Sequence, residues 1–503
     1  MSDVIGHRIR DGLNLAVPPE RWHNVAVVII GGGVAGLSAA WQLQRAGVTD
    51  FIVLELEPQP GGTSRSETSP LVPYPWGAHY LPVPLKENTQ LVALLDEIGL
   101  LEGRTQDGDP VVAEQYLYRD PQERLFYRGR WYEGLYLHAG ASAEDLAQFE
   151  AFTTEIDRWV AWRDSRGRRA FTIPAATCSD DAEVTALDQI TMSEWLNQHG
   201  WRSPRLRWLV DYGCRDDFGL TVEQTSAWAG IFYFAARVKS PGDDAQPLMT
   251  WPEGNGRLVT YLSSALRSQV RLGLAVADIN PVATNGREHL EVRAFDTHTQ
   301  APIGFHADRV ILTTPQMLSR YLIRPYRDDP PAHLREFSYG SCMVANVLLT
   351  QRPESRGFPL AWDNVLYDSP SLGYVVATHQ RGLDHGPTVL TYYYPFCDTD
   401  PQLARAKFLA VDWRTCADIV FTDLRRPHPS LHKVAQRLDV MRWGHAMIHP
   451  HPDFVWSEAR RRASVPFRGI HFANTDLSGV ALFEEAFYHG VRAAEEVLKE
   501  NGK

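Results

Sequence analysis

Cysteine is scarce in this chain, with 5 among 503 residues and no pair at the Cys-x-x-Cys spacing. Small secreted domains that rely on disulfides use a dense and even set of cysteines. Structural zinc sites use cysteine and histidine at short, repeated spacings. The sequence therefore predicts neither a disulfide scaffold nor a metal site, and it favours a reducing, cytoplasmic compartment.

The chain also lacks an excess of positive charge, because 50 lysine and arginine residues face 61 aspartate and glutamate residues, for a formal net charge of −11. Nucleic-acid-binding domains usually carry a basic face, so no nucleic-acid partner is expected. Residues 25–43 are apolar over a length that could cross a bilayer, but three adjacent glycines favour a buried strand followed by a buried helix. No transmembrane segment or secretory signal is expected, whereas peripheral contact with a membrane and the oligomeric state stay open.

A nucleotide-binding pattern stands near the N-terminus. Residues 25–30 are a β-branched apolar run, which predicts a buried strand. The stretch GGGVAG at 31–36 follows, and then a helical period that stops at Gly47. A second apolar strand at 51–54 ends in Glu55, 24 residues after the first glycine of the run. Together these segments predict one βαβ unit.

The first, third and sixth residues of GGGVAG fit the Gly-x-Gly-x-x-Gly spacing. Gly31 permits a tight turn, Gly33 lets the backbone approach a pyrophosphate, and Gly36 lets the helix pack close to the strand. The helix N-terminus then faces the phosphate charge, and Glu55 can accept hydrogen bonds from a ribose. An empty glycine turn is the other interpretation, which the strand and helix on either side disfavour. Taken alone, the pattern allows NAD, NADP or FAD.

A second glycine pair follows in 58-PQPGGTSRSE-67. Gly61 and Gly62, with Arg65 just beyond, are not part of a nicotinamide Rossmann unit. They suit a cofactor that extends past its pyrophosphate and needs close backbone and a fixed cation. Considered alone, the pair is explained better as an ordinary glycine turn.

With these motifs the chain resembles the FAD-dependent superfamily of flavin amine oxidases, phytoene-desaturase-type enzymes and protoporphyrinogen oxidase. Four motifs in the family's order carry the resemblance: residues 31–66, WGAHYL at 76–81, 270–279 with 307–315, and 469–479 with 484–498. The resemblance implies FAD as the cofactor. The context of Cys397 does not match the family's attachment segment, so the flavin is expected to be noncovalent.

The resemblance assigns cofactor contacts on all four motifs. The residues concerned are Gly31, Gly33, Val34, Ala35, Gly36, Glu55, Gly61, Gly62, Arg65, Gly77, Ala78, His79, Val276, Thr314, Asp476, Leu482 and Phe483. Val276 would offer a backbone group to the adenine, and Asp476 would bind the ribitol–pyrophosphate region. Leu482 and Phe483 would approach the flavin O2 side, where a helix N-terminus would stabilise the negative charge of a reduced flavin.

Position also suggests candidates for the chemistry. His79 could act as a base, as a hydrogen-bond partner of the ring, or only as a residue that orients the flavin. Trp228, Phe232 and Trp443 could line an apolar substrate pocket, although core packing explains an aromatic run at helical spacing more simply. The polar run RDD at 215–217 could meet a charged substrate group or cap a turn.

Two positions depart from the amine oxidases of this superfamily. Their lysine that holds a water near flavin N5 has no match on residues 339–349, where Met343 or Val344 stands. The aromatic residue that monoamine oxidases carry on the last helix corresponds to Leu482. Both departures weaken the expectation of amine oxidation with oxygen as acceptor and leave FAD binding untouched.

The predicted fold class is α/β, with a glutathione-reductase-type FAD-binding Rossmann domain and an inserted mixed α/β substrate domain. We assign 25–90, 251–325 and 456–503 to a discontinuous FAD domain, 91–250 and 326–455 to the substrate domain, and 1–24 to an N-terminal extension.

The predicted function is an FAD-dependent oxidoreductase of the amine-oxidase type. It would transfer a hydride equivalent from a C–N or C–C bond of a small or hydrophobic substrate to flavin N5, with oxygen or another acceptor completing the cycle. A desaturase or isomerase acting on a polyene or porphyrinogen-like substrate is the alternative. A non-enzymatic protein like the Rab GDP-dissociation inhibitors is disfavoured by Glu55, Arg65 and Asp476.

Overall fold

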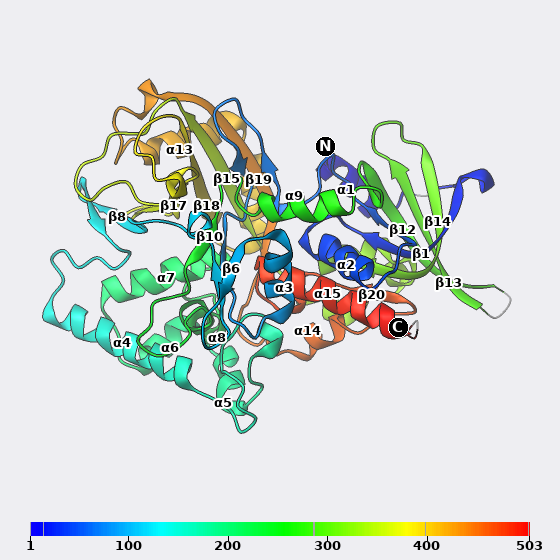
Figure 1. Ribbon diagram of the computed structural model, residues 1–503, viewed down its shortest axis with the longest axis horizontal. Coiled ribbons are helices and arrows are strands. Elements are labelled where there is room, and N and C mark those ends of the chain that lie inside the picture. Colours follow the sequence, from blue (N-terminus) through cyan, green and yellow to red (C-terminus); the bar gives the residue numbers. More distant parts are fainter. Residues whose placement is uncertain (1, 14, 285–286, 398, 501, 503) are drawn as a thin grey trace. The chain divides into compact units, whose positions relative to one another are not determined.

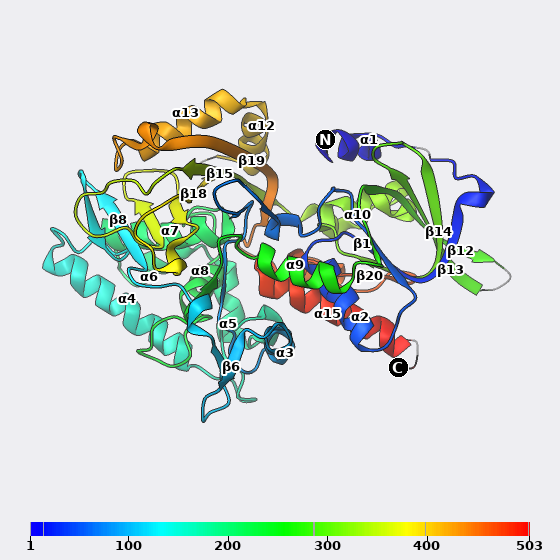
Figure 2. The same cartoon turned by 45° about the horizontal axis from the view of Figure 1, so that its top comes forward.

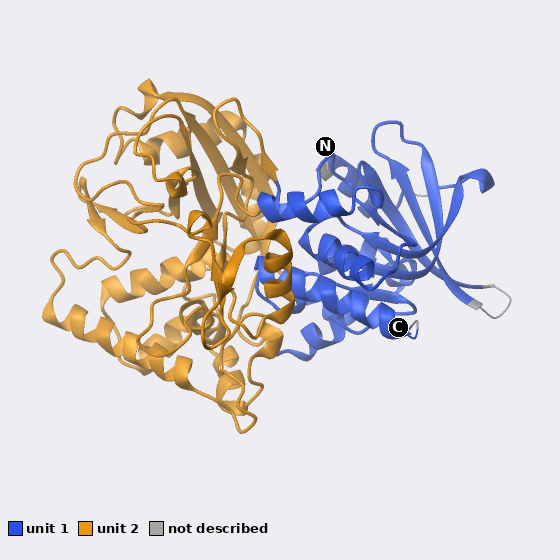
Figure 3. Cartoon of the chain, viewed as in Figure 1, with its two compact units in different colours: residues 1–65, 256–337, 456–503 blue, residues 66–255, 338–455 orange. Residues whose placement is uncertain are grey.

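The computed structural model describes residues 2–13, 15–284, 287–397, 399–500 and 502. The chain divides into two compact units, shown in different colours in Figure 3. Unit 1 comprises residues 1–65, 256–337 and 456–503, and unit 2 comprises residues 66–255 and 338–455. Each unit has a large β-sheet of its own.

A mixed sheet forms the centre of unit 1 (Figures 1 and 2). Its strands are β1 (Trp22–Ile30), β2 (Phe51–Leu54), β11 (Val270–Arg271), β12 (Leu274–Thr284), β13 (Arg287–Asp296), β14 (Pro302–Leu312) and β20 (Ile470–Phe472). Strand β1 lies between β2 and β14 and is parallel to both. Strands β13 and β12 continue the sheet in antiparallel pairing, while β20 pairs in parallel with the end of β14.

The helices of unit 1 include the one predicted after the glycine run. They are α1 (Ser2–Arg10), α2 (Val34–Arg45), α9 (Gly256–Ala265), α10 (Gln316–Leu322), α11 (Arg324–Asp328), α14 (Glu458–Ala463) and α15 (Phe483–Glu500). Helix α2 joins β1 to β2 and packs against α9 and α15, beside which it lies in Figures 1 and 2. The buried Leu37 and Trp41 form its apolar side.

Helices α2 and α15 approach each other so closely that only glycine fits at their contact. A Cβ added to Gly490 would lie 2.2 Å from the carbonyl oxygen of Ala35 and from Ser38 Oγ. The amphipathic pattern of α15 buries Phe487, whose ring centroid is 5.5 Å from that of Trp41. The last helix of the chain therefore supports the first one of the nucleotide unit.

A second mixed sheet forms the centre of unit 2. In sheet order its strands are β19 (Ala435–Ile448), β15 (Tyr339–Leu349), β18 (Thr388–Phe396), β17 (Gly373–Val376), β16 (Asp363–Leu366), β8 (Glu123–Tyr127) and β9 (Arg130–Glu133). The pairing is antiparallel except between β16 and β8, which run parallel. Short pairs lie outside this sheet: β3 (Ser66–Glu67) with β4 (Tyr74–Pro75), β5 (Tyr80–Pro82) with β10 (Leu248–Thr250), and β6 (Leu101–Arg104) with β7 (Pro110–Val112).

The helices of unit 2 are grouped in two parts of its sequence. They are α3 (Thr89–Ile98), α4 (Ala143–Ala161), α5 (Ala182–Thr185), α6 (Met192–Gln198), α7 (Pro204–Phe218), α8 (Ala227–Ala235), α12 (Pro401–Ala410) and α13 (Trp413–Leu424). Helix α8 packs against α4, α6 and α7, which explains why it is apolar on every side. Helix α7 begins with the cap Ser203 and Pro204 and ends at Gly219, whose φ of 64° suits a C-terminal glycine.

The structure confirms the predicted α/β class. Strand β2 and the start of α15 have the predicted bounds, whereas β1 begins at Trp22, before the β-branched run. Residues 66–90 belong to unit 2. Among the described residues, no helix is both long enough and apolar enough to cross a bilayer.

Candidate functional site

The glycine turn between β1 and α2 has the local geometry that a phosphate-binding turn requires. Gly31 adopts a φ of 107°, which side chains disfavour. A Cβ on Gly36 would lie 1.9 Å from the carbonyl oxygen of Gly31, so the helix can start here only with glycine at this position. Around Gly33, by contrast, the nearest atom to an added Cβ is Gly62 Cα at 4.0 Å. The protein itself therefore leaves free space at Gly33.

The second glycine pair lies directly against this turn. The Gly61 N–H donates to the carbonyl oxygen of Gly32 at 2.7 Å, and Gly61 forms a parallel bridge with Gly33. Gly61 has a φ of 116°, and its Cβ would meet Val259 Cγ1 at 2.9 Å. Two glycine segments thus form one surface of bare backbone, where a pyrophosphate can approach closely.

Glu55 stands at the end of β2, as predicted, and only 8% of it is exposed. Its carboxylate accepts hydrogen bonds from the Gly32 N–H at 2.6 Å and the Glu57 N–H at 2.7 Å. Burial raises the pKa of Glu55, and the two N–H groups oppose this shift. A carboxylate has about four lone-pair sites, so ribose hydroxyls can still donate to it. Arg65 Nη1 lies 3.7 Å from Glu57 Oε2, and the Arg65 side chain is mostly buried.

The opposite end of the expected cofactor site is built from β14 and the segment after β20. Asp476 is 3% exposed and accepts a hydrogen bond from the Gln316 N–H at 2.7 Å. The Asn474 side chain donates to the carbonyl oxygen of Thr314 at 2.8 Å. These contacts fix the loop that follows β20 against the end of β14.

Three buried polar atoms at this end have no hydrogen-bond partner among the described residues. They are Thr314 Oγ1, Gln316 Nε2 and Asn474 Oδ1. Buried polar groups are nearly always hydrogen-bonded, so three unpaired atoms close in sequence to Asp476 and β14 suit a bound cofactor that would pair with them. Thr314 is among the cofactor contacts that the resemblance assigned, whereas Gln316 and Asn474 were not predicted. Their only signal in the sequence is that they flank the predicted strands.

Helix α15 begins at Phe483, as the resemblance implied, and Leu482 immediately precedes it. Glu485 in its first turn is fully buried and accepts a hydrogen bond from Ser478, which also bonds to His489 Nε2 at 2.8 Å. Burial lowers the pKa of His489 well below its usual value, so this histidine is neutral. The sequence analysis did not identify this internal network.

Val276 lies on β12, 7% exposed, at the point where the register between β12 and β13 shifts. The irregularity between Val276 and Asp278 interrupts the regular ladder. Such an interruption leaves backbone groups available to a ligand, which suits the adenine contact that the resemblance assigns to Val276.

In unit 2, Gly77 and Ala78 lie in the loop before β5, and His79 is 4% exposed. Burial lowers the pKa of His79 to about 3, so it is neutral near pH 7. A histidine with so low a pKa is a weak base, which favours an orienting role over proton abstraction. The Tyr393 hydroxyl donates to the carbonyl oxygen of Gly77 at 2.8 Å and lies 3.4 Å from His79 Nδ1.

The three aromatic pocket candidates occupy different environments. Trp228 and Phe232 on α8 are 0% and 1% exposed, and their rings stack with centroids 5.0 Å apart. Trp443 on β19 is only partly buried, and its indole N–H donates to the carbonyl oxygen of Trp76 at 2.5 Å. Of the three, Trp443 contacts the segment that the resemblance places beside the flavin.

A cluster of carboxylates and tyrosines occupies the interior of unit 2. Of its residues, only those in the polar run at 215–217 were predicted from the sequence. Glu123 on β8 and Asp363 on β16 are direct neighbours in the parallel register of these strands. The negative charge of Asp216 on α7 raises the pKa values of both the Asp363 carboxyl and the Tyr393 hydroxyl. We call Glu123, Asp216 and Asp363 the acidic cluster.

Tyrosine hydroxyls donate to the acidic cluster. Tyr212 bonds to Asp363 at 3.1 Å, and Tyr233 bonds to Asp216 at 3.4 Å. Burial raises the pKa of Glu123 to about 7 and raises the pKa values of Asp216 and Asp363 in the same direction. Repulsion between the carboxylates adds to the shifts at Asp216 and Asp363. As whole residues, all three are intermediate in exposure.

The glycine turn, Glu55 and the unpaired atoms around Asp476 define unit 1 as a dinucleotide-binding fold that suits FAD. The sequence profile of the flavin containing amine oxidoreductases matches residues 34–498. The chain therefore belongs to this family. The family assignment confirms FAD as the cofactor and makes the chain an FAD-dependent oxidoreductase of the amine-oxidase type.

Solved structures share the fold. Putrescine oxidase bound to putrescine is 16% identical, with a TM-score of 0.67 over 95% of this chain and 100% of that one. Cyclohexylamine oxidase from Brevibacterium oxydans is 16% identical, with a TM-score of 0.65 over 96% and 100% of the two chains. A fatty acid isomerase from P. acnes is 16% identical, with a TM-score of 0.65 over 94% and 98%.

A curated relative matches over a short segment only. Baeyer–Villiger monooxygenase from Streptomyces coelicolor is 49% identical over 47 residues, which are 9% of this chain and 9% of that protein. So short a match shows local likeness and gives no information on the substrate.

Proposed function

We propose that the chain oxidises an amine that carries a second positive group, such as a diamine or a polyamine. The observation that carries this proposal is the acidic cluster inside unit 2. Arg237 pairs with Asp217 at 2.7 Å, and its charge also acts on Asp216, whose pKa it lowers, so one guanidinium faces more than one carboxylate. Carboxylates that outnumber the positive charge near them are costly to keep ionised in an interior, so they either take up protons, as their raised pKa values indicate, or bind a cationic ligand.

The residues around the acidic cluster suit an ammonium group. The carboxylates would bind the charge, and the Tyr233 ring beside them already holds a cation, because the Arg237 guanidinium lies 5.4 Å from its centroid. Burial raises the pKa of Tyr393 well above its usual value, so its hydroxyl stays protonated and donates to Gly77. Tyr393 thus lies within electrostatic range of Asp216 and Asp363 and also bonds to Gly77, in the segment that the resemblance places beside the flavin.

Bound FAD would accept the hydride equivalent from the carbon next to the reacting nitrogen. The role of this chain's residues would be to hold the remote ammonium and to fix which carbon is presented. The lysine that has no match on β15 holds a water near flavin N5 in the related amine oxidases, so its absence does not affect binding of the remote ammonium by the acidic cluster.

The alternative substrate class is an uncharged or acidic lipid-like molecule. The structural similarity to a fatty acid isomerase is the reason to consider it. A fatty acid carries a carboxylate, and the acidic cluster would repel it. A neutral polyene would leave the three carboxylates without a counter-charge. The interior of unit 2 therefore favours the amine.

Anaerobic flavin reduction tests the proposal directly. We expect α,ω-diamines to bleach the flavin with a kcat/KM about tenfold or more above that of the monoamine with the same number of heavy atoms, because only the diamine places a charge on the carboxylates. Stopped-flow absorbance with diamines, matched monoamines, fatty acids and polyenes gives the comparison. Bleaching by a fatty acid or polyene but by no amine would overturn the proposal.

The pH dependence of diamine binding gives a second prediction. The carboxyls of Glu123 and Asp216 have raised pKa values, with about 7 for Glu123. The folded chain binds the protons of these two carboxyls more tightly than the unfolded chain does. The protonated carboxyls therefore add to the stability of the folded chain in acid, and this contribution is lost as the pH rises through about 7. A bound ammonium favours the ionised form, so affinity should rise with pH, by about tenfold per unit below pH 7 for one displaced proton.

Anaerobic titration calorimetry of the enzyme with its flavin reduced beforehand, so that the diamine binds without turnover, measures this slope from about pH 5.5 to about 8.5. The Glu123→Gln variant, which cannot titrate at this position, should show a shallower slope. An affinity that is constant or that increases in acid would contradict ammonium binding at these carboxylates.

We also propose oxygen as the electron acceptor and a cytoplasmic location. The family assignment supports the acceptor. The five cysteines are all buried and form no disulfide with one another, which suits a reducing compartment.

A further inference from the structure

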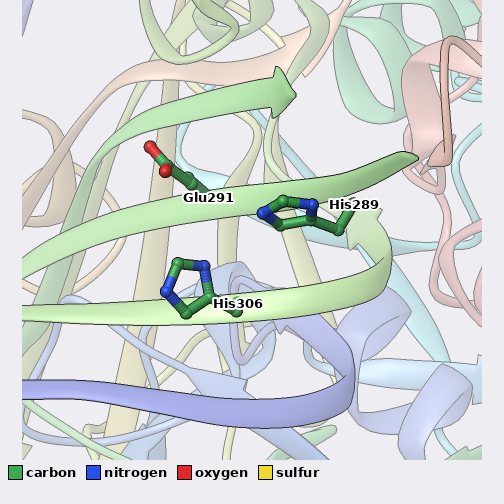
Figure 4. A group of neighbouring side chains, drawn as sticks. All are labelled: His289, Glu291 and His306. Atoms are coloured by element: carbon green, nitrogen blue, oxygen red, sulfur yellow. The ribbon is translucent and has the colours of Figure 1, made fainter. Parts of the chain in front are cut away.

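Two histidines and a glutamate converge on the antiparallel strands β13 and β14 of unit 1 (Figure 4). Glu291 and His306 are direct partners across the two strands, and His289 precedes Glu291 by two residues on the same face. One ligand atom from each of the three residues lies within 4.8 Å of the other two. All three side chains are partly buried.

The neighbouring residues hold His306 in place. The Trp22 indole stacks on its imidazole with ring centroids 4.4 Å apart and an interplanar angle of 18°. Gly304 makes this possible, because a Cβ there would lie 2.5 Å from the Trp22 ring. The buried Nδ1 of His306 has no hydrogen-bond partner among the described residues. A fixed imidazole with an unpaired buried nitrogen is a group that a ligand would satisfy.

Glu291 is also oriented by a neighbour. The Arg293 guanidinium donates to one of its carboxylate oxygens at 2.8 Å, which leaves the second oxygen available. Hydrogen bonds to ligating carboxylates are common around protein metal ions, where they fix the ligand's direction.

We propose that His289, Glu291 and His306 form a binding site for a divalent transition-metal ion, with Zn²⁺ as the test ion. Imidazole nitrogens and a carboxylate oxygen are ligands that suit Zn²⁺, and a water would complete the coordination. With bonds of about 2.0–2.2 Å, a tetrahedral ion would draw its ligand atoms to roughly 3.4 Å from one another.

The proposal goes beyond the flavin chemistry and does not depend on the substrate. It departs from the sequence-based expectation of no metal site. A bound ion would tie β13 to β14 and stabilise the folded chain by mass action.

Equilibrium dialysis of the untagged holoenzyme against Zn²⁺, after removal of adventitious metal with a chelator, tests the site. We expect one Zn²⁺ per chain with saturable binding. His289→Ala and His306→Ala should each weaken the affinity by about 100-fold or more, and Glu291→Gln by about 10-fold or more. The exposed His298, in the turn between the same strands, provides the matched control His298→Ala, which should bind like the parent.

The flavin absorbance and thermal melting of each variant check that it is folded. His306 packs on Trp22, so Glu291→Gln serves if His306→Ala fails to fold. The absence of saturable binding by the parent chain overturns the proposal. Equal affinity of the parent, the folded histidine variant and Glu291→Gln overturns it as well.

Discussion

Replacing Gly33 with valine should yield a folded but colourless protein. The structure places no protein atom closer than 4.0 Å to an added Cβ at this position, and Gly33 has a φ of −73°, which any residue adopts. The side chain would instead fill the space that the pyrophosphate needs. We expect the flavin absorbance of the purified Gly33→Val variant to fall to less than about a tenth of the parent's, a loss of about 1.4 kcal/mol or more in cofactor affinity.

The control for this variant is Gly103→Val. Gly103 lies on the exposed strand β6, and nothing stands within 4 Å of its added Cβ. This variant should keep its full flavin content. Far-ultraviolet circular dichroism separates loss of cofactor from loss of fold. A Gly33→Val protein that purifies fully yellow would show that the cofactor lies elsewhere.

Replacing Asp216 with asparagine should reduce kcat/KM for a diamine by a factor of about 30 to 1000, corresponding to about 2 to 4 kcal/mol for a truncated buried charge pair. The amide keeps the shape of the carboxylate and its contact with Tyr233 but removes the charge. The loss should appear in KM more than in kcat, because the remote ammonium binds in the ground state and the transition state alike. Steady-state kinetics with a diamine and its matched monoamine measure both.

The monoamine is the internal control, because it places no second charge on the acidic cluster. Asp418→Asn on the exposed side of α13 is the matched variant and should behave like the parent. An equal loss for diamine and monoamine in Asp216→Asn would indicate a structural role for Asp216. It would then remove the basis for assigning a diamine substrate.

The sequence predicted the parts of the site that are built within one short segment. Gly31, Gly33 and Gly36 act within a single strand–turn–helix, so their spacing defines their geometry. Glu55 could be predicted for the same reason, because it ends the next strand of that unit. Family resemblance extended this reach to Asp476, although the contact of Asp476 with the Gln316 N–H joins segments that no local pattern links.

The parts of the site that were not predicted depend on register and burial. Glu123 and Asp363 are neighbours only because β8 and β16 pair in one particular register. The histidine–glutamate cluster likewise needs the pairing of β13 with β14. The aromatic run on α8 is compatible in sequence with either a pocket wall or a core. The structure buries Trp228 completely, with 0% exposure, among the core residues.

The contact between Gly490 and Ala35 has a consequence for biosynthesis. The ribosome makes Ala35 in the nucleotide turn 455 residues (490 − 35 = 455) before Gly490 in the helix that packs against α2. At about 5–20 residues per second, α15 follows α2 by roughly 20 to 90 s, and during that time Trp41 lacks its contact with Phe487. FAD loading is therefore expected only after α15 has been synthesised, and chaperones that bind exposed apolar helices have most opportunity to act during that interval.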